Sequence, residues 1–371
     1  MVGPSVEDVG LGVPKRANCC HTDGMNVLHK TPALADAVLA SLADIPFPSI
    51  DADRPPALLT RCPAAAVTPL FEAPDLAKAA GVGQVHIKDE RGRMGLGSFK
   101  ALGAAYVIAR DAEEGNAKGR TYVTASAGNH GLSVAAGAQA FGARAVVYLA
   151  DTVPEGFADR LRSFGAEVVR HGAIYEEAMA GAAQAAKDNG WALLSDSSWP
   201  GYLDRPYTLM EGYLVLMQEA VAQMPAPPTH IFLQAGVGGL ATACAAYARV
   251  AWEDGPRIIV VEPEAAPALY SSIKAGSAQV TEGPESSMGR LDCKEPSLIA
   301  LKGLARDAND FMLITEEEGA TGSAACAEAG YATTPSGGAG VAGLLSARQV
   351  GDALGLSINS RVLVILSEQA A

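Results

Sequence analysis

The sequence predicts an α/β fold of two lobes, in which mainly parallel sheets are covered by helices. Short apolar runs alternate along the chain with longer helical patterns, and several runs, such as VVYLA and IIVV, have no polar face. The alternation is typical of βαβ units and a parallel sheet, and fully apolar strands are typical of a sheet buried on both faces. With 371 residues, the chain exceeds the roughly 250–300 residues that one core usually supports.

The elements are expected in the following order. Residues 1–60 form an irregular, proline-rich arm with one helix near 33–42. The apolar runs predict strands at 84–88, 120–124, 145–149, 167–170, 191–194, 230–234, 257–262 and 361–366. The longer patterns predict helices at 98–112, 129–141, 154–164, 175–188, 208–223, 240–252 and 341–353. Ser98 is the expected N-cap of the first of these helices, and Gly165 ends the third.

Composition and charge exclude several classes of function. The formal net charge is −13, which argues against a nucleic-acid surface because phosphate backbones require a basic footprint. The N-terminus lacks a signal pattern, and no apolar run approaches the roughly 20 residues that span a bilayer, so we expect a cytoplasmic protein. The cysteines at 19, 20, 62, 244, 293 and 326 form no zinc-binding pattern, and we expect them to be reduced.

A glycine-rich loop separates the strand expected at 230–234 from the helix that follows it. The residues of this loop are Gly236, Val237, Gly238, Gly239 and Leu240. Glycines allow backbone amides to point outward, and the helix N-terminus adds positive potential, so the loop could hold a phosphate. A simple tight turn would look the same. The loop matches neither the dinucleotide fingerprint nor a P-loop, which favours a small phosphorylated cofactor.

Two other loops lie at the start of predicted helices. Lys100 lies in GSFKALGA, at the positive end of a helix, where a cation is disfavoured. We therefore expect a lowered pKa that suits imine formation, although a surface lysine is the ordinary alternative. The second loop, SAGNHG at 126–131, offers backbone amides and the side chain of Asn129 to a carboxylate. An Asn or His helix cap would explain this loop equally well.

Together these three loops resemble the fold-type II pyridoxal-phosphate enzymes, which include threonine dehydratases and tryptophan synthase β. SFKALGA resembles their lysine motif S-F-K-x-R-G-A, SAGNHG their substrate loop S-x-G-N-H, and AGVGGLA their phosphate loop. The resemblance extends from about residue 68 to the C-terminus. The stretches SDSSWPGY, LMEGY and SSMGRLDCKEPS narrow it to the diaminopropionate ammonia-lyases, which convert 2,3-diaminopropionate to pyruvate and ammonia. The block at 288–297 is the most specific, because ordinary threonine dehydratases lack it.

The resemblance implies pyridoxal 5′-phosphate as the cofactor and a role for each matching residue. Lys100 would bind the cofactor's aldehyde, Asn129 its phenolic oxygen, and the loop from Gly236 to Leu240 its phosphate. Ser367 would face the pyridine nitrogen, which favours elimination. The residues implied in substrate binding are Ser126, Ala127, Gly128 and His130. The resemblance also implies a homodimer, a large domain of residues 1–120 and 201–371, and a small mobile domain of residues 121–200.

The sequence departs from the ammonia-lyase pattern at one acidic position. The family's ammonia-lyases use two aspartates, and Asp196 matches one of them, whereas Ala127 replaces the other. Because a methyl group accepts no proton, we expect Asp196 to act on one enantiomer only, the L-isomer. Without the resemblance, Asp196 would be a turn residue. Some relatives bind a metal through a Glu and an Asp. Glu262 fits the first position but Ala268 lies at the second, so we expect no metal.

The expected function is therefore elimination from a small β-substituted amino acid, with 2,3-diaminopropionate as the best candidate and neither nucleic acid nor membrane as a partner. Dehydration of serine, threonine or hydroxyaspartate is the main alternative, since SAGNHG is closer to the dehydratase loop. A racemase needs a base on each face of the substrate, and Ala127 removes one candidate. A nucleotide-binding protein that uses only the glycine loop is the alternative from another class.

Overall fold

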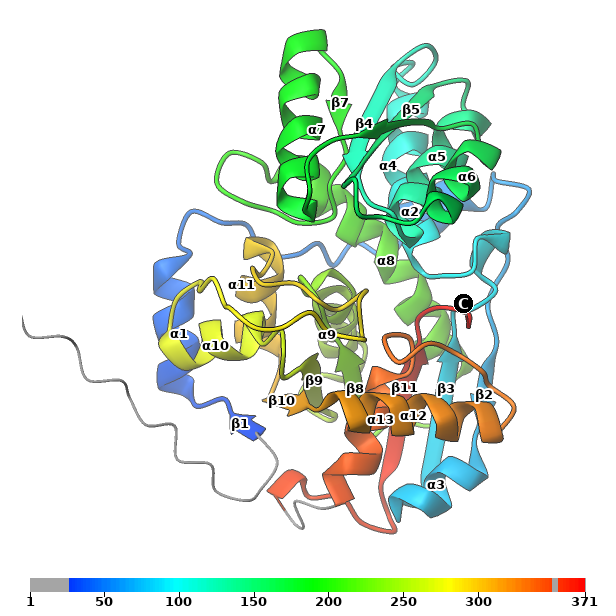
Figure 1. Cartoon of the computed structure of the whole chain (residues 1–371). Helices are drawn as coiled ribbons and strands as arrows, with labels where there is room; N and C mark the ends of the chain where they lie inside the picture. Colours follow the sequence, from blue (N-terminus) through cyan, green and yellow to red (C-terminus); the bar gives the residue numbers. More distant parts are fainter. Residues whose placement is uncertain (1–26, 349–352, 371) are drawn as a thin grey trace, which may run out of the picture.

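The computed structural model describes residues 27–348 and 353–370, and it contains two sheets (Figure 1). The larger sheet has the strand order β1-β10-β9-β8-β11-β3-β2 and the smaller one the order β6-β5-β4-β7. The strands of the larger sheet are β1 (Val27–His29), β2 (Leu70–Glu72), β3 (Gln84–Asp89), β8 (His230–Gln234), β9 (Arg257–Pro263), β10 (Asp310–Ile314) and β11 (Arg361–Leu366). The strands of the smaller sheet are β4 (Thr121–Ala125), β5 (Arg144–Leu149), β6 (Glu167–Arg170) and β7 (Ala192–Leu193).

Parallel pairing dominates both sheets. All pairs in the smaller sheet are parallel, and the larger sheet is antiparallel only where its edge strands β1 and β2 pair with β10 and β3. Strand β11 lies inside the larger sheet, between β8 and β3. Its residues from Val362 to Leu366 are all buried, as parallel strands covered on both faces should be. The predicted α/β class with mainly parallel sheets is confirmed.

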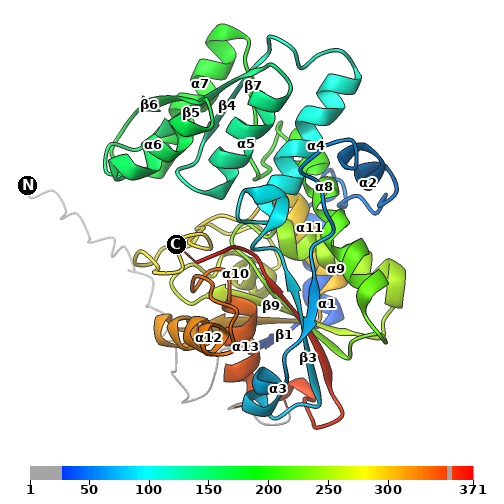
Figure 2. The ribbon, with the colours of Figure 1, turned by 90° about the vertical axis from the view of Figure 1, so that its right-hand side faces the viewer.

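The helices cover the two sheets and connect them. Those beside the smaller sheet are α4 (Lys100–Glu113), α5 (Asn129–Ala140), α6 (Glu155–Ser163) and α7 (Tyr175–Asn189). The others are α1 (Pro32–Ser41), α2 (Arg54–Leu59), α3 (Pro74–Ala80), α8 (Asp204–Gln223), α9 (Gly239–Trp252), α10 (Ala268–Ala275), α11 (Leu298–Asp307), α12 (Glu316–Glu328) and α13 (Ala339–Ala347), with one 3₁₀ turn at Arg93–Gly95. Figure 2 shows α4 and α8 between the two sheets. One apolar core cluster includes side chains from both helices and continues into each sheet.

Most predicted elements are present with ends that differ by a few residues, but several were missed. The edge strands β1 and β2 have three residues each, too few to show a period. Strand β10 and helices α2, α3, α10, α11 and α12 were also not predicted. Ser98 is not a helix cap: α4 begins at Lys100 after Phe99, with no capping side chain. Ser98 instead forms a β-bridge with Glu368.

The described residues also bear on the predictions about cysteines and membranes. No helix among them is long and apolar enough to cross a bilayer. Their cysteines at 62, 244, 293 and 326 are free thiols, whereas Cys19 and Cys20 lie outside the described residues, as does the part of the proline-rich arm before residue 27. Burial raises the pKa of Cys293 to about 12, so this thiol stays protonated at neutral pH.

Candidate functional site

Lys100 is the first residue of α4, and its ammonium group points at Asp196. Nζ donates a hydrogen bond to Asp196 Oδ2, and the two side chains are 22% and 19% exposed. The same Nζ lies 5.2 Å from the ring centre of Phe99 and 6.0 Å from that of Tyr213. The lysine is therefore no surface residue. It is largely buried, with two aromatic rings and one carboxylate beside its ammonium group.

The expected direction of the Lys100 pKa shift is wrong. Burial alone lowers the pKa of Lys100, but attraction to the Asp196 carboxylate outweighs burial and holds the pKa well above its usual value. The converse holds for Asp196: burial raises its pKa, and the nearby Lys100 ammonium more than reverses this. The helix N-terminus is thus the weaker influence. The pair is a salt bridge in which one partner must change charge before the lysine can act as a nucleophile.

The loop that carries Asp196 is fixed from two directions. On one side, Ser195 N donates to the hydroxyl of Tyr202 (2.9 Å), which itself donates to the Leu193 carbonyl (3.0 Å). On the other side, Ser198 shares a hydrogen bond of 2.7 Å with Ser297. Ser297 N in turn donates to the Val237 carbonyl (3.0 Å). The SDSSWPGY and CKEPS stretches and the glycine loop therefore form one hydrogen-bonded unit.

The glycine loop at 236–240 leads from β8 into α9. Gly238 has φ +99°, a left-handed conformation that favours glycine. A Cβ on Gly236 would lie 2.9 Å from the Cys293 sulfur, so a side chain there would collide with the neighbouring segment. The first amide groups of a helix have no acceptor within it, and here they belong to Gly239 and Leu240. The loop is thus a narrow cradle of backbone donors at a positive helix end.

The loop at 126–130 leads from β4 into α5. Ser126 Oγ accepts a hydrogen bond of 3.2 Å from Gly128 N, and Asn129 Nδ2 donates to Glu368, the residue after Ser367. His130 Nε2 donates to the Leu194 carbonyl (2.8 Å), and burial lowers the pKa of this imidazole. His130 therefore holds the segment before Asp196.

Two charged residues lie in this region that the sequence analysis did not assign to the site. Glu368 is buried and accepts hydrogen bonds from Asn129 and Thr334. Arg290 lies 3.7 Å from Glu368, and its guanidinium carbon would be 3.2 Å from a Cβ on Gly128. Glu368 could have been found, because it follows the carboxyl end of a buried parallel strand, where sites of α/β folds lie. Arg290 lies inside the specific block at 288–297, but its contact with Gly128 has no signal in the local sequence.

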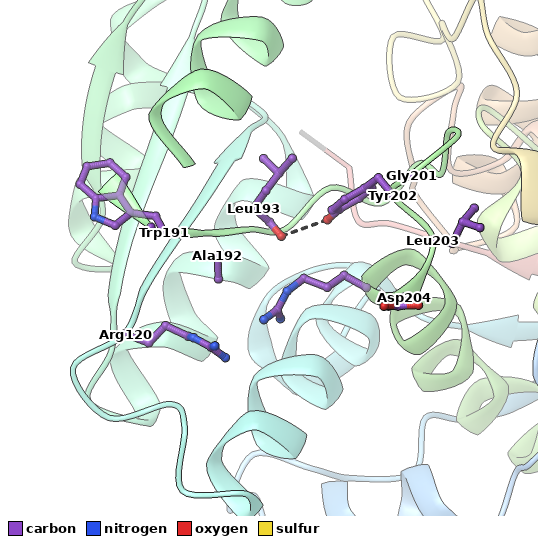
Figure 3. A pocket seen from close by; sticks show the side chains of 10 residues that line it. Arg120, Trp191, Ala192, Leu193, Gly201, Tyr202, Leu203 and Asp204 are labelled. Atoms are coloured by element: carbon purple, nitrogen blue, oxygen red, sulfur yellow. Dashed lines mark hydrogen bonds between the residues drawn. The ribbon is translucent and has the colours of Figure 1, made fainter. Parts of the chain in front are cut away.

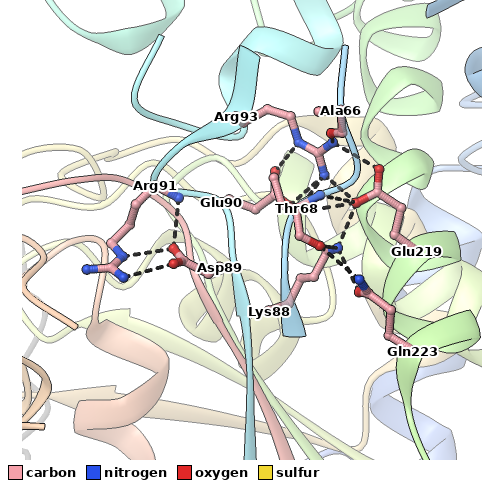
Figure 4. A network of polar contacts seen from close by, with 9 residues as sticks. All are labelled: Ala66, Thr68, Lys88, Asp89, Glu90, Arg91, Arg93, Glu219 and Gln223. Carbon is pink, nitrogen blue, oxygen red and sulfur yellow. Dashed lines mark hydrogen bonds and ion pairs between the residues drawn. The ribbon is translucent and has the colours of Figure 1, made fainter. Parts of the chain in front are cut away.

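A buried network of charges supports the segment that leads to Lys100 (Figure 4). Arg93 donates to both oxygens of Glu90 at 2.7 Å and to both oxygens of Glu219 at 2.9 and 2.7 Å. Lys88 donates to Glu219 at 2.6 Å, and Thr68 donates to Glu90 at 2.6 Å. Two cations and two anions balance, and Lys88 and Glu90 are fully buried. The network joins β3 and the turn after it to α8.

Glu262, which fits one position of the metal site of some relatives, binds backbone amides in this structure. Glu262 is fully buried, and its oxygens accept hydrogen bonds from Leu269 N (2.8 Å) and Tyr270 N (2.7 Å) at the start of α10. Burial raises the pKa of Glu262 to about 8. Among the described residues, no group of three or more His, Cys, Asp or Glu side chains could hold a metal ion.

The donors gathered here fit a phosphorylated aldehyde cofactor. They comprise an amine at Lys100, an amide side chain at Asn129, a buried hydroxyl at Ser367 and the backbone cradle at Gly236. Ser367 O also accepts from Phe99 N (3.1 Å), so the end of β11 lies against the lysine segment. An amine, a hydroxyl and an anion cradle in one place match an aldehyde, a ring nitrogen and a phosphate.

Comparison with known proteins assigns the family. A sequence model of the family described as pyridoxal-phosphate dependent enzymes matches residues 62–368. The chain belongs to this family, and the predicted cofactor, pyridoxal 5′-phosphate, is confirmed. A structure of threonine deaminase isoform 2 from Solanum lycopersicum has the same fold, with a TM-score of 0.76 at 20% identity.

The more similar relatives identify the group within the family. Diaminopropionate ammonia-lyase from Salmonella typhimurium is 36% identical over 273 residues, which span 65% of this chain and 66% of that one. The Escherichia coli K12 enzyme of the same name is 34% identical over 276 residues, 69% of each chain. A crystal structure of the Escherichia coli enzyme with D-serine gives a TM-score of 0.81 at 27% identity, covering 93% of this chain and 94% of that one. The chain is a member of the ammonia-lyase group of pyridoxal-phosphate enzymes.

Proposed function

We propose that this protein eliminates the β-amino group of L-2,3-diaminopropionate to give pyruvate and two molecules of ammonia. The contact between Lys100 and Asp196 carries the proposal, because it sets one acid/base group beside the amine that would receive the cofactor. The names of the relatives from Salmonella typhimurium and Escherichia coli support the same substrate. The reaction balances with one water: diaminopropionate and water give pyruvate and two ammonia.

Each residue of the cofactor site would have a separate task. Lys100 would attach the aldehyde, Asn129 would donate to the phenolic oxygen, and the amides around Gly238 would hold the phosphate. Ser367 would offer a neutral hydroxyl to the ring nitrogen. When bound, the cofactor supplies an electron sink that acidifies the Cα–H bond of the substrate.

Asp196 is the proposed proton carrier. Its pKa lies well below its usual value beside Lys100, so the group is an acceptor in the resting site. It would take the Cα proton and then return a proton to the departing β-amine, which a general acid makes a better leaving group. His130 and the Ser198–Ser297 contact would keep the loop in place. The released aminoacrylate then hydrolyses in water to pyruvate and the second ammonia.

The substrate carboxylate would lie on the loop at 126–130. Ser126 and the amide groups after it would donate to the carboxylate oxygens. Arg290 adds a positive charge, because its guanidinium lies against Gly128 of this loop. An α-carboxylate held on this side would direct the β-amine away from Arg290, so that two cations need not approach one another.

The absence of a carboxylate at position 127 supports selectivity for the L-isomer. Asp196 would serve one face of the substrate, and Ala127 has no proton acceptor for the other. The test is pyruvate and ammonia release from the D- and L-isomers of 2,3-diaminopropionate and serine, with threonine and hydroxyaspartate alongside. Two ammonia per pyruvate support the diamino substrate. Comparable rates on both isomers would exclude the stereochemical part.

Dehydration of a 3-hydroxy amino acid is the second candidate. It is favoured by the SAGNHG loop and by relatives such as the mouse L-serine dehydratase/L-threonine deaminase, 33% identical over 211 residues. In the same panel, a higher kcat/KM for serine or threonine than for diaminopropionate, with one ammonia per pyruvate, would favour this reaction.

A further inference from the structure

A cavity of about 350 Å³ lies beside the loop that carries Asp196 (Figure 3). Its lining residues include Leu193, just before the loop, and Tyr202 and Arg205, just after it. Arg120, at the start of β4, completes one wall. The volume is within the range of small-molecule sites, roughly 300–1,000 Å³. Both stems of the Asp196 loop therefore border this cavity, whereas Asp196 itself faces Lys100.

Two arginines of this cavity share one carboxylate. Arg120 and Arg205 each donate through Nη1 to Asp111 Oδ2, at 2.9 and 3.1 Å. The hydroxyl of Tyr122 donates to the same oxygen (2.7 Å). Asp111 engages one N–H group of each guanidinium, so the remaining N–H groups of both arginines are not used by this carboxylate. The arginine side chains are 35% and 23% exposed, which leaves other N–H donors within reach of a ligand.

One acidic residue also lines the cavity. Asp204 is at the first turn of α8, where its charge interacts favourably with the helix dipole. Among the described residues, no cation lies within 4.0 Å of its carboxylate, in contrast to Asp111. Asp111 and Asp204 together balance the two guanidinium charges, so a ligand would be held by the planar N–H donors of the arginines, which match the two oxygens of a carboxylate.

The cavity is coupled to the Asp196 loop through Tyr202. The Tyr202 hydroxyl bridges Ser195 N and the Leu193 carbonyl. Its ring stacks on Trp199 with 4.4 Å between ring centres. A ligand against Tyr202 and Leu193 would restrain both stems of the loop. We propose that this cavity binds a small carboxylate between Arg120 and Arg205 and thereby steadies Asp196.

The proposed binding of a carboxylate is independent of the proposed function. The proposed effect on Asp196 rests on that function. The test uses the cofactor-loaded full chain and propionate as the probe, with chloride at equal ionic strength as the reference. Calorimetric titration should show saturable binding of propionate to the wild type. The elimination rate should change with the same concentration dependence.

Substitutions separate this cavity from the substrate site. Arg205→Gln should weaken propionate binding at least about ten-fold, the loss expected for one charge-assisted hydrogen bond, and Arg205→Lys should restore part of it. Arg162→Gln is the matched control, because Arg162 is exposed, pairs with Glu155 and does not line the cavity. Arg290→Gln should leave binding unchanged, whereas propionate in the substrate site would be lost with it.

Several outcomes would overturn the proposal. Binding no stronger than that of chloride, or equal affinity in wild type and Arg205→Gln, would exclude the carboxylate site. Saturable binding in the cavity without any change in elimination rate would exclude the coupling to Asp196. If Arg205→Gln fails to fold, Arg120→Gln takes its place in the same titration. Failure of the elimination reaction itself would leave the calorimetric result intact, so the two proposals fail separately.

Discussion

Replacing Asp196 by asparagine tests the central pair of the site. The amide keeps the size of the side chain but carries no negative charge and is not a proton carrier. A positioned acid/base group contributes a factor of about 10²–10⁴, which equals about 2.7–5.4 kcal/mol of activation free energy. We therefore expect kcat for pyruvate release to fall by about 10²–10⁴. The assay is coupled detection of pyruvate with cofactor-saturated enzyme.

The same substitution changes Lys100 in the opposite sense. The high pKa of Lys100 is due to the Asp196 charge, and burial alone lowers it. Without that charge, a larger fraction of the amine is neutral at a given pH, and neutral amine attaches an aldehyde. We expect cofactor attachment to the variant to be as fast as to wild type or faster, although kcat falls. Asp188→Asn, at an exposed position of α7, is the control. A loss of kcat below ten-fold, or slower attachment, would refute the reasoning.

Three further predictions follow from named contacts. Glu219→Gln leaves a buried cation of the Figure 4 network unpaired and should lower the free energy of unfolding in urea by about 3–5 kcal/mol. Glu113 pairs only with exposed arginines, so Glu113→Gln should lower it by less than about 1 kcal/mol. Equal losses of stability in the two variants would contradict the assigned network. The Ala127→Asp variant should produce pyruvate from D-serine at a measurable rate. A variant without this activity would show that another residue determines the enantiomer selectivity. In the cofactor-free chain, Lys100→Met should lower the free energy of unfolding most between about pH 4 and pH 10. The lowered pKa of Asp196 gives wild-type stability that is lost as pH falls, and the raised pKa of Lys100 gives stability that is lost as pH rises. A stability difference between wild type and variant that does not depend on pH would contradict this.

The sequence predicts the buried parallel strands and the helices between them well, because each has a clear local pattern. The edge strand β1 could not be predicted, since its three residues gain their structure from pairing with β10, far along the chain. Strand β10 itself, DFMLI, is apolar enough to be recognised and was overlooked beside a long irregular segment. Ser98 shows the limit of capping rules, because its backbone pairs with Glu368 before the helix begins.

The sequence proposes residues for the candidate site but does not predict their electrostatics. Lys100, Asn129 and the glycine loop lie in recognisable local motifs, whereas the charge on Lys100 is set by Asp196, which is 96 residues away in sequence. The same limit applies to Arg290, whose contact with Gly128 crosses from one part of the fold to another. Pairings over such separations follow from tertiary packing, and no local period reports them.

The position of β11 has a consequence for the biosynthesis of the enzyme. Among the described residues this strand is the last in sequence, yet it lies between β8 and β3, and Ser367 and Glu368 follow it directly. Until it has left the ribosome, β3 and β8 cannot share a sheet, and Asn129 lacks its partner Glu368. A nascent or truncated chain therefore exposes two apolar strand edges and has no complete place for the cofactor. Insertion of β11 between β8 and β3 is therefore required before the cofactor site is complete.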